Sequence, residues 1–245
     1  MYPMATGAKA VVLAASITAF LFLQGSQAAA QDEQPAAPPP TPAGAAPPTE
    51  QTSHARIAGV MPDFLTVNDA AGIKPLTTRE KYNVVTRTAF DWFQYGWYTF
   101  TSGVGAAAGV GDGYGTGVHG FGRRYATNFA DGTAENYFVG AVWPSLLHQD
   151  PRYFRKTTGS GGSRAGYAMT RVFVTRNDAG RHRFNFSEVL GAASATLVAN
   201  AYHPAPDRTV HGNVVTMTSL ITYDMLANLL KQFWPDVATA LKHHH

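Results

Sequence analysis

The sequence predicts an all-α fold, a compact bundle of five or six helices packed through glycine and alanine. Three observations lead to this prediction. Apolar residues recur at the spacing of a helix face in several segments. Helix-start signals precede those segments. Small residues are abundant, with 24 glycines in 245 residues, and glycine, alanine and serine dominate residues 186–202.

The N-terminus has the pattern of a secretory signal peptide, which we assign to residues 1–30. Lys9 precedes a 14-residue, mostly apolar run (10–23), and small residues follow at 28–30. An uncleaved membrane anchor is the alternative, although a bilayer span needs roughly 20 residues. Either interpretation predicts export, to the periplasm, the outer membrane or the cell surface.

Residues 31–56 are rich in proline and alanine and almost free of large apolar residues. Such a segment buries too little surface to offset its ordering entropy, so we predict a disordered tether. Residues 57–242 are then a single helical domain. The final histidines, 243–245, are a tail to which no role is assigned.

Composition excludes several classes of function. The chain has no cysteine, which rules out disulfides, thiolate metal sites, a cysteine nucleophile and a lipid-modified N-terminal cysteine. The net charge of +3 is too mild to indicate a nucleic-acid partner. No cofactor is predicted.

The first predicted helix starts at a capping box, because Thr77 stands three residues before Glu80. Apolar residues over 82–100 then fall on one helical face, and Arg87 is spaced to pair with Asp91. The segment carries an unusual aromatic load: Trp92, Tyr95, Trp97 and Tyr98. These rings fit either a protein core or a belt at a membrane interface.

Residues 102–122 are very rich in glycine, which lowers intrinsic helicity. They fit either a long loop or a closely packed helix with GxxxG spacing. A clearer helix is predicted over 133–147, with Pro144 kinking it or weakening its hydrogen bonds.

Further helices are predicted over 163–176, 186–202 and 212–234. Asn185, three residues before Glu188, starts the second of these, and Pro235 ends the third. Residues 172–187 also fit a β-hairpin, but we predict helix followed by loop because the flanking segments are helical in pattern.

The motif WPSLLHQDPRYF, residues 143–154, holds the candidate catalytic residues His148, Asp150 and Tyr153. A histidine beside a carboxylate can act as an acid–base pair, with Tyr153 or Arg152 stabilising an oxyanion. The simpler interpretation is structural: Asp150 caps a short helical turn that begins at Pro151. A third metal ligand is not evident, so no metal site is predicted.

The segment 151–186 is strongly basic, with eight lysines and arginines against one acid, Asp178. It fits an anionic partner: lipid headgroups, polysaccharide or an acidic protein surface. A solvated surface with some buried arginine–carboxylate pairs is the alternative. The predicted binding residues are Arg152, Arg155, Arg164, Arg171 and Arg176.

Together these features predict an exported, envelope-associated helical protein that works as a binding or scaffold module, with self-association into a homo-oligomer as a further expectation. The alternative is a small periplasmic hydrolase or transferase that uses His148 and Asp150. The aromatic content raises a third hypothesis, a lipid- or pigment-binding helical domain.

Overall fold

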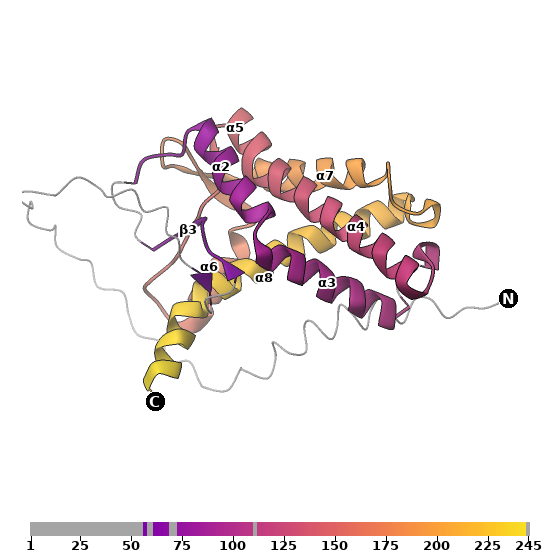
Figure 1. Ribbon diagram of the computed structural model, residues 1–245. Coiled ribbons are helices and arrows are strands. Elements are labelled where there is room, and N and C mark those ends of the chain that lie inside the picture. The colour runs from indigo at the N-terminus through magenta and orange to yellow at the C-terminus, as the bar shows by residue number, and fades with distance from the viewer. Residues whose placement is uncertain (1–55, 58–60, 69–72, 110–111, 244–245) are drawn as a thin grey trace, which may run out of the picture.

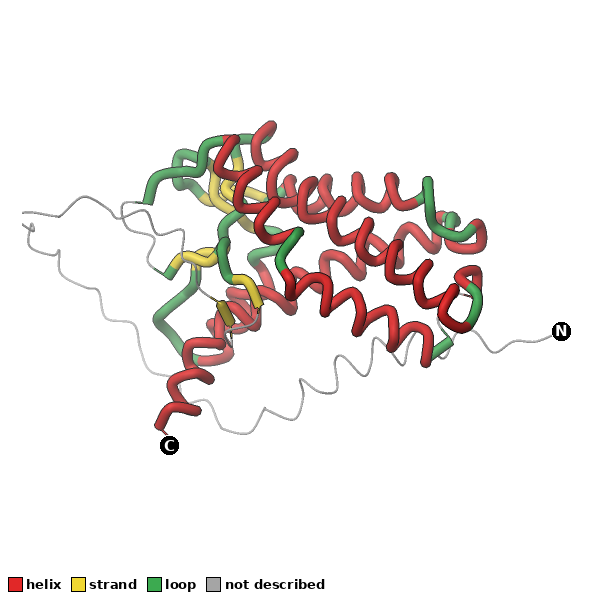
Figure 2. The backbone as a smooth tube through the Cα atoms, viewed as in Figure 1, coloured by secondary structure: helices red, strands yellow, loops and turns green. Residues whose placement is uncertain are grey.

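The computed structural model of the protein describes residues 56–57, 61–68, 73–109 and 112–243. The predicted signal peptide, and the predicted tether except for Arg56, lie outside the described residues. The described chain is mostly helical, as predicted, with short strands gathered at one end of the bundle (Figures 1 and 2). The helices are α2 (Thr78–Ala89), α3 (Trp92–Ala107), η1 (Asp112–Tyr114), α4 (Gly117–Tyr137), η2 (Phe138–Val142), α5 (Trp143–Leu146), α6 (Gly161–Thr170), α7 (Phe186–Ala199), η3 (Ala205–Asp207) and α8 (Val210–His243).

The single helix predicted from Thr77 through residue 100 is two helices. The capping box at the start of α2 is confirmed, because the Glu80 amide donates to the Thr77 hydroxyl at 3.3 Å and Glu80 Oε2 accepts from the Thr77 amide at 2.7 Å. The chain then turns at Asp91, whose carboxylate accepts from the Phe93 amide and starts α3. The predicted pair of Arg87 with Asp91 is wrong, since Asp91 pairs instead with Arg56 at 2.6 Å.

Helices α4, η2 and α5 form one continuous helical run from residue 117 to 146. The described part of the glycine-rich segment therefore holds the end of α3, the short 3-10 helix η1 and the start of α4. The prediction that a helix begins at 133 is wrong. η2 is a π-helix that directly precedes α5, where Pro144 cannot donate a backbone hydrogen bond.

Small residues make the predicted close contacts between helices. A Cβ on Gly191 of α7 would lie 2.9 Å from the Cα of Val139, and one on Gly140 would lie 2.6 Å from Cγ2 of Val85. α4 packs against α3 and α7, and α8 packs against α7 and α6. A buried cluster of Ala192, Ala195 and Leu220 lies where α7 meets α8.

Strands form three small sheets in the described part of the chain. The strands are β1 (Arg56–Ile57), β2 (Met61–Pro62), β3 (Thr66–Val67), β4 (Gln149–Asp150), β5 (Tyr153–Phe154), β6 (Val174–Asn177) and β7 (His182–Phe184). β1 pairs with β2, β3 runs parallel to β5, and β4, β6 and β7 form one antiparallel sheet.

The helix-then-loop prediction for residues 172–187 is wrong, because β6 and β7 form the rival hairpin. Gly180 has a positive φ of 75° in the turn, a conformation that glycine adopts without steric cost. β6 also pairs with β4, which lies more than 20 residues earlier in the chain. This contact stabilises a strand, and the helical pattern of the neighbouring segments carries no information about it. The helical turn predicted after Asp150 is also wrong, since Tyr153 and Phe154 form a strand.

α8 does not end at Pro235 as predicted; it continues to His243. Arg164 of α6 holds both sides of the proline, through an ion pair of 2.6 Å with Asp236 and a hydrogen bond of 3.2 Å to the Gln232 carbonyl. These contacts offset the loss of one helical hydrogen bond. Within the described residues, no helix combines the length and apolar character that crossing a membrane requires.

Candidate functional site

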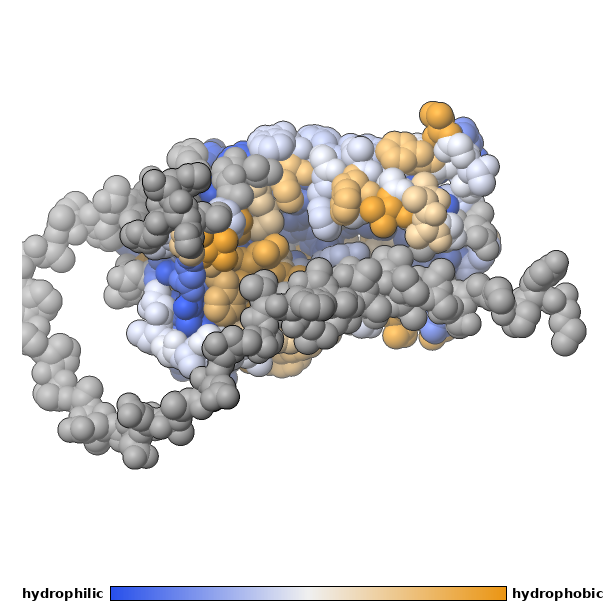
Figure 3. Space-filling model, turned by 90° about the horizontal axis from the view of Figure 1, so that it is seen from below, coloured by the Kyte–Doolittle hydropathy of each residue, from blue (hydrophilic) through white to orange (hydrophobic). Residues whose placement is uncertain are grey.

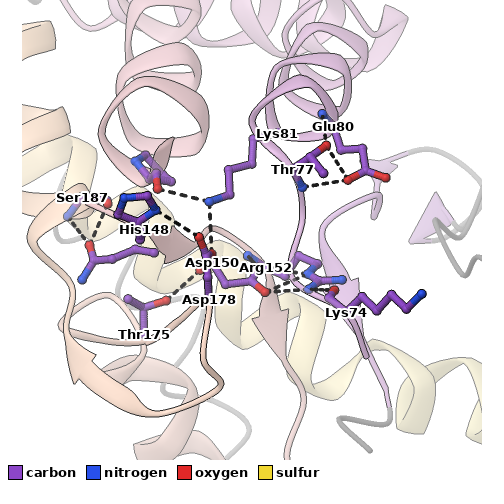
Figure 4. A network of polar contacts seen from close by, with 12 residues as sticks. Lys74, Thr77, Glu80, Lys81, His148, Asp150, Arg152, Thr175, Asp178 and Ser187 are labelled. Carbon is purple, nitrogen blue, oxygen red and sulfur yellow. Dashed lines mark hydrogen bonds and ion pairs between the residues drawn. The ribbon is translucent and has the colours of Figure 1, made fainter. Parts of the chain in front are cut away.

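Asp150 and Arg152 form a tight pair in the predicted motif (Figure 4). Arg152 Nη2 lies 2.6 Å from Asp150 Oδ2, and Arg152 Nε lies 2.9 Å from Oδ1. The Arg152 amide also donates to Oδ1, at 3.0 Å. The buried carboxylate is therefore neutralised by its own turn, as expected of a structural aspartate.

His148 belongs to a different set of contacts. Its side chain is 83% exposed, and Nδ1 lies 3.6 Å from Asp178 Oδ2. The other Asp178 oxygen accepts from Lys81 Nζ at 3.2 Å, and the Pro144 carbonyl accepts from the same nitrogen (Figure 4). His148 and Asp150 thus have separate partners, and no shared contact supports the acid–base role predicted for them.

The hydroxyl of Tyr153 is buried and donates to Oε1 of Gln232 at 2.7 Å. Burial, reinforced by the nearby Tyr167, raises the pKa of Tyr153 well above its ordinary value. Gln232 is fully buried and also bonds the backbone of Lys156 through its side-chain oxygen and nitrogen. This arrangement joins β5 to α8, which is a structural task.

The five arginines predicted to bind an anion fall into three groups. Arg152 and Arg164 are paired with carboxylates. Arg171 instead stacks on the Tyr167 ring at 4.4 Å, and Arg176 stacks on Phe154 at 4.3 Å. No carboxylate of the described residues lies within ion-pair distance of either. Arg155 has two buried guanidinium nitrogens without a hydrogen-bond partner.

A cavity of about 900 Å³ lies among the helices and strands, and several of the predicted residues line it. Residues of α3, α4, α7 and α8 line much of it, along with residues of β4, β5 and β6. The space-filling view from below shows a hollow with hydrophilic residues between more apolar neighbours (Figure 3). The predicted site residues that line the cavity are Asp150, Arg152, Tyr153, Arg171 and Arg176.

Three carboxyl groups in the cavity were missed by the sequence analysis: Glu135 of α4, Glu188 of α7 and Asp224 of α8. We call them the carboxyl trio. The capping pattern singled out Glu188 only for its place at the start of α7, where its backbone amide donates to Asn185 Oδ1 at 3.2 Å. Its side chain, however, is only 5% exposed and faces the cavity. A charged residue on an otherwise apolar helix, such as Asp224, was the one available signal.

The carboxyl trio is electrostatically unusual. Burial raises the pKa of Glu135 and Glu188, and the charge of Asp224 raises both further. Burial also raises the pKa of Asp224, against the attraction of Lys231 and a hydrogen bond with Glu188. The contact with Asp224 thus raises the pKa of Glu188, whereas the contact with Glu188 opposes the rise in the pKa of Asp224.

Asp131 lies one helical turn before Glu135 and already has partners. His203 Nε2 lies 2.9 Å from its Oδ2, and the Tyr202 hydroxyl donates to its Oδ1 at 2.6 Å. By contrast, Oε1 of Glu135 and Oε1 of Glu188 are buried without a hydrogen-bond partner. The unsatisfied acceptors of the cavity are therefore concentrated in the carboxyl trio.

Across the described ranges, no three or more histidine, aspartate or glutamate side chains are placed so that they could hold a metal ion. Comparison with protein-family models, with curated proteins and with solved structures gave no match.

Proposed function

We propose that the protein is a binding protein of the cell envelope that holds an amphiphilic, anionic ligand in its cavity. The observation that carries the proposal is the pair Arg171 and Arg176, which line the cavity and have no carboxylate partner among the described residues. The export pattern of residues 1–30 supports the envelope location.

The two arginines are held by aromatic rings and not by acids. The guanidinium carbons of Arg171 and Arg176 lie over the rings of Tyr167 and Phe154, an arrangement that attracts the cation to the ring face. Nη1 of Arg171 contacts Nδ1 of His182 at 3.4 Å. The other edge donors of a guanidinium that lies over a ring remain suited to a carboxylate or phosphate. The Nε atoms of both residues are buried without a hydrogen-bond partner, so an anion in the cavity would satisfy them.

The remaining lining favours a ligand with a hydrocarbon part. Apolar residues of α3 and α8 contribute much of the wall: Phe93, Trp97, Phe100, Val104, Leu226 and Leu230. A concave, mostly apolar site with a few placed charges is typical of small-molecule binding. Of the anionic partners predicted from the sequence, a lipid-like molecule fits this wall best.

Calorimetric titration with dodecanoate, below its micelle-forming concentration, tests the proposal. We expect Arg171→Gln and Arg176→Gln each to weaken binding by about tenfold, the loss of one charge-assisted contact. Dodecanol, which has no charge, should bind all proteins equally. Arg181→Gln is the matched control, because Arg181 is an exposed arginine of the same basic segment. Equal dodecanoate affinity in the wild type and the double variant would refute the proposal.

A separate experiment tests the location. We expect the full chain, expressed in a bacterial host, to appear in the envelope fraction with a new N-terminus near residue 30. An unprocessed protein in the cytosolic fraction would contradict this part of the proposal.

A further inference from the structure

We propose that the carboxyl trio of Glu135, Glu188 and Asp224 is a second binding site in the cavity, which takes the ammonium group of an organic amine. The site rests on the proposed function in sharing its cavity, but it uses different residues and a ligand group of opposite charge.

The trio is assembled by the tertiary structure from three helices, α4, α7 and α8. α7 packs against both α4 and α8, and all three side chains line the cavity. Helices position such groups more precisely than loops do. The trio is therefore a built arrangement and not a chance cluster of surface acids.

The site has more acceptors than the protein satisfies. Glu188 is 95% buried, since its exposed fraction is 5%, and its Oε1 has no hydrogen-bond partner although it lines the cavity. Oε1 of Glu135 is in the same state. A buried carboxyl oxygen without a partner is costly, so such atoms are normally paired unless they serve a function.

Lys231 of α8 lies near enough for its charge to favour ionisation of Asp224 and Glu188. One lysine against three carboxyl groups leaves room for a further positive charge. Arg171 and Arg176 do not fill this role, because no ion pair joins either of them to the trio among the described residues. The arginine pair and the trio are thus separate sites.

An ammonium group fits the trio better than a metal ion does. The described carboxylates lack the geometry for metal ligation. An ammonium group has three donors in flexible directions, which matches unpaired oxygens contributed by different helices. Tyr98 and Tyr223 lie near enough to Glu135 for its charge to affect them, and aromatic rings favour organic cations. A ligand that carries both an ammonium and an anionic group would engage both sites.

Calorimetric titration of the purified protein with dodecylammonium chloride, below its micelle-forming concentration, tests the inference. We expect Glu135→Gln, Glu188→Gln and Asp224→Asn each to weaken its binding by about tenfold or more. Dodecanol binding should stay unchanged in all three variants. Asp236→Asn is the matched control. Asp236 lies on α8, as Asp224 does, but it is an exposed residue that pairs with Arg164.

Folding of the variants is checked by thermal unfolding. Replacing a buried, unsatisfied carboxyl by an isosteric amide should leave the melting temperature equal or higher, so weaker binding with an undiminished melting temperature supports the site. Unchanged dodecylammonium affinity in the Glu135→Gln/Glu188→Gln double variant would overturn it. The proposed function is tested separately, because dodecanoate binding depends on Arg171 and Arg176 and not on the carboxyl trio. A failure of one titration therefore leaves the result of the other unaffected.

Discussion

The hydroxyl of Tyr153 donates a 2.7 Å hydrogen bond to Oε1 of Gln232, a fully buried side chain 79 residues away in the chain. The bond joins β5 to α8, and Gln232 extends the connection to the backbone of Lys156. A residue that the motif marked as catalytic is therefore part of the internal framework.

The first prediction concerns this bond. Tyr153→Phe removes one hydrogen bond and leaves Gln232 Oε1 satisfied by the Lys156 amide, so we expect a loss of about 0.5–1.5 kcal/mol in the free energy of unfolding. Gln232→Leu strands three polar groups and should cost clearly more, about 1–3 kcal/mol for each group that water cannot reach. Urea denaturation measures both. An equal cost for the two variants would show that Gln232 is not the hub.

The second prediction concerns Lys81, whose side chain is 2% exposed and bonds Asp178 and the Pro144 carbonyl. Lys81→Met keeps the aliphatic length but leaves both acceptors without their donor. We expect a loss of about 1.5–3 kcal/mol in the free energy of unfolding, the range for hydrogen bonds to a charged group. His148→Gln is the control: His148 is largely exposed, so this change should have a much smaller effect.

The third prediction concerns helix packing at Gly191. Its added Cβ would lie 2.6 Å from Cγ2 and 2.9 Å from Cα of Val139, so Gly191→Ala must displace backbone. We expect a cost of about 1–3 kcal/mol, as for overpacking. Gly166 of α6 has open space at its Cβ position, and Gly166→Ala should gain up to about 1 kcal/mol from helix propensity. Thermal unfolding of both variants checks this, and destabilisation by Gly166→Ala would contradict the explanation.

The fourth prediction concerns Asp91, which caps α3 and binds Arg56. Burial opposes its ionisation, but hydrogen bonds from Arg56 and from the Phe93 amide outweigh burial and lower the pKa of Asp91. Asp91→Ala should cost about 0.5–2 kcal/mol through loss of the cap alone. Asp91→Asn keeps a capping oxygen and should cost less. Measured unfolding free energies that reverse this order would refute the capping role.

The fifth prediction is a pH dependence of stability that arises from the carboxyl trio. Folding raises the pKa of Glu135 and of Glu188. At any pH between the unfolded-state pKa and the folded-state pKa of such a group, the folded protein binds more protons than the unfolded protein. Their contribution to the free energy of unfolding is fully present below about pH 4, the ordinary pKa range of carboxyl groups. It is lost as the pH rises through the raised pKa of the folded state. The wild type should therefore lose stability relative to Glu188→Gln as the pH rises, by at most about 1.4 kcal/mol per pH unit.

The measurement is the difference in unfolding free energy between the wild type and Glu188→Gln, from pH 4 to pH 8. Taking the difference cancels groups with the opposite sign, such as Asp91, whose lowered pKa adds stability as the pH rises. A difference that stays constant over this range would show that Glu188 titrates normally in the folded protein.

Local signals predicted the parts of the fold that local contacts decide. The Thr77 capping box and the Asn185 cap both form, and the helices that they start pack through small residues at Gly140 and Gly191. Such signals extend over three or four residues, which is the reach of a helical turn. They failed at Asp91 and at residues 172–187, where the partners are Arg56 and strand β4.

The sequence by itself determined that the chain is mostly helical, where several helices begin, and that arginines are concentrated in 151–186. Only the tertiary structure decided which arginines are already paired, and that Glu135, Glu188 and Asp224 meet in one cavity. Periodicity assigns a residue to a face of its own helix, but it carries no information on which other helix that face meets. Lys81 and Asp178, 97 residues apart, are joined by the packing of the whole bundle, and so is the carboxyl trio.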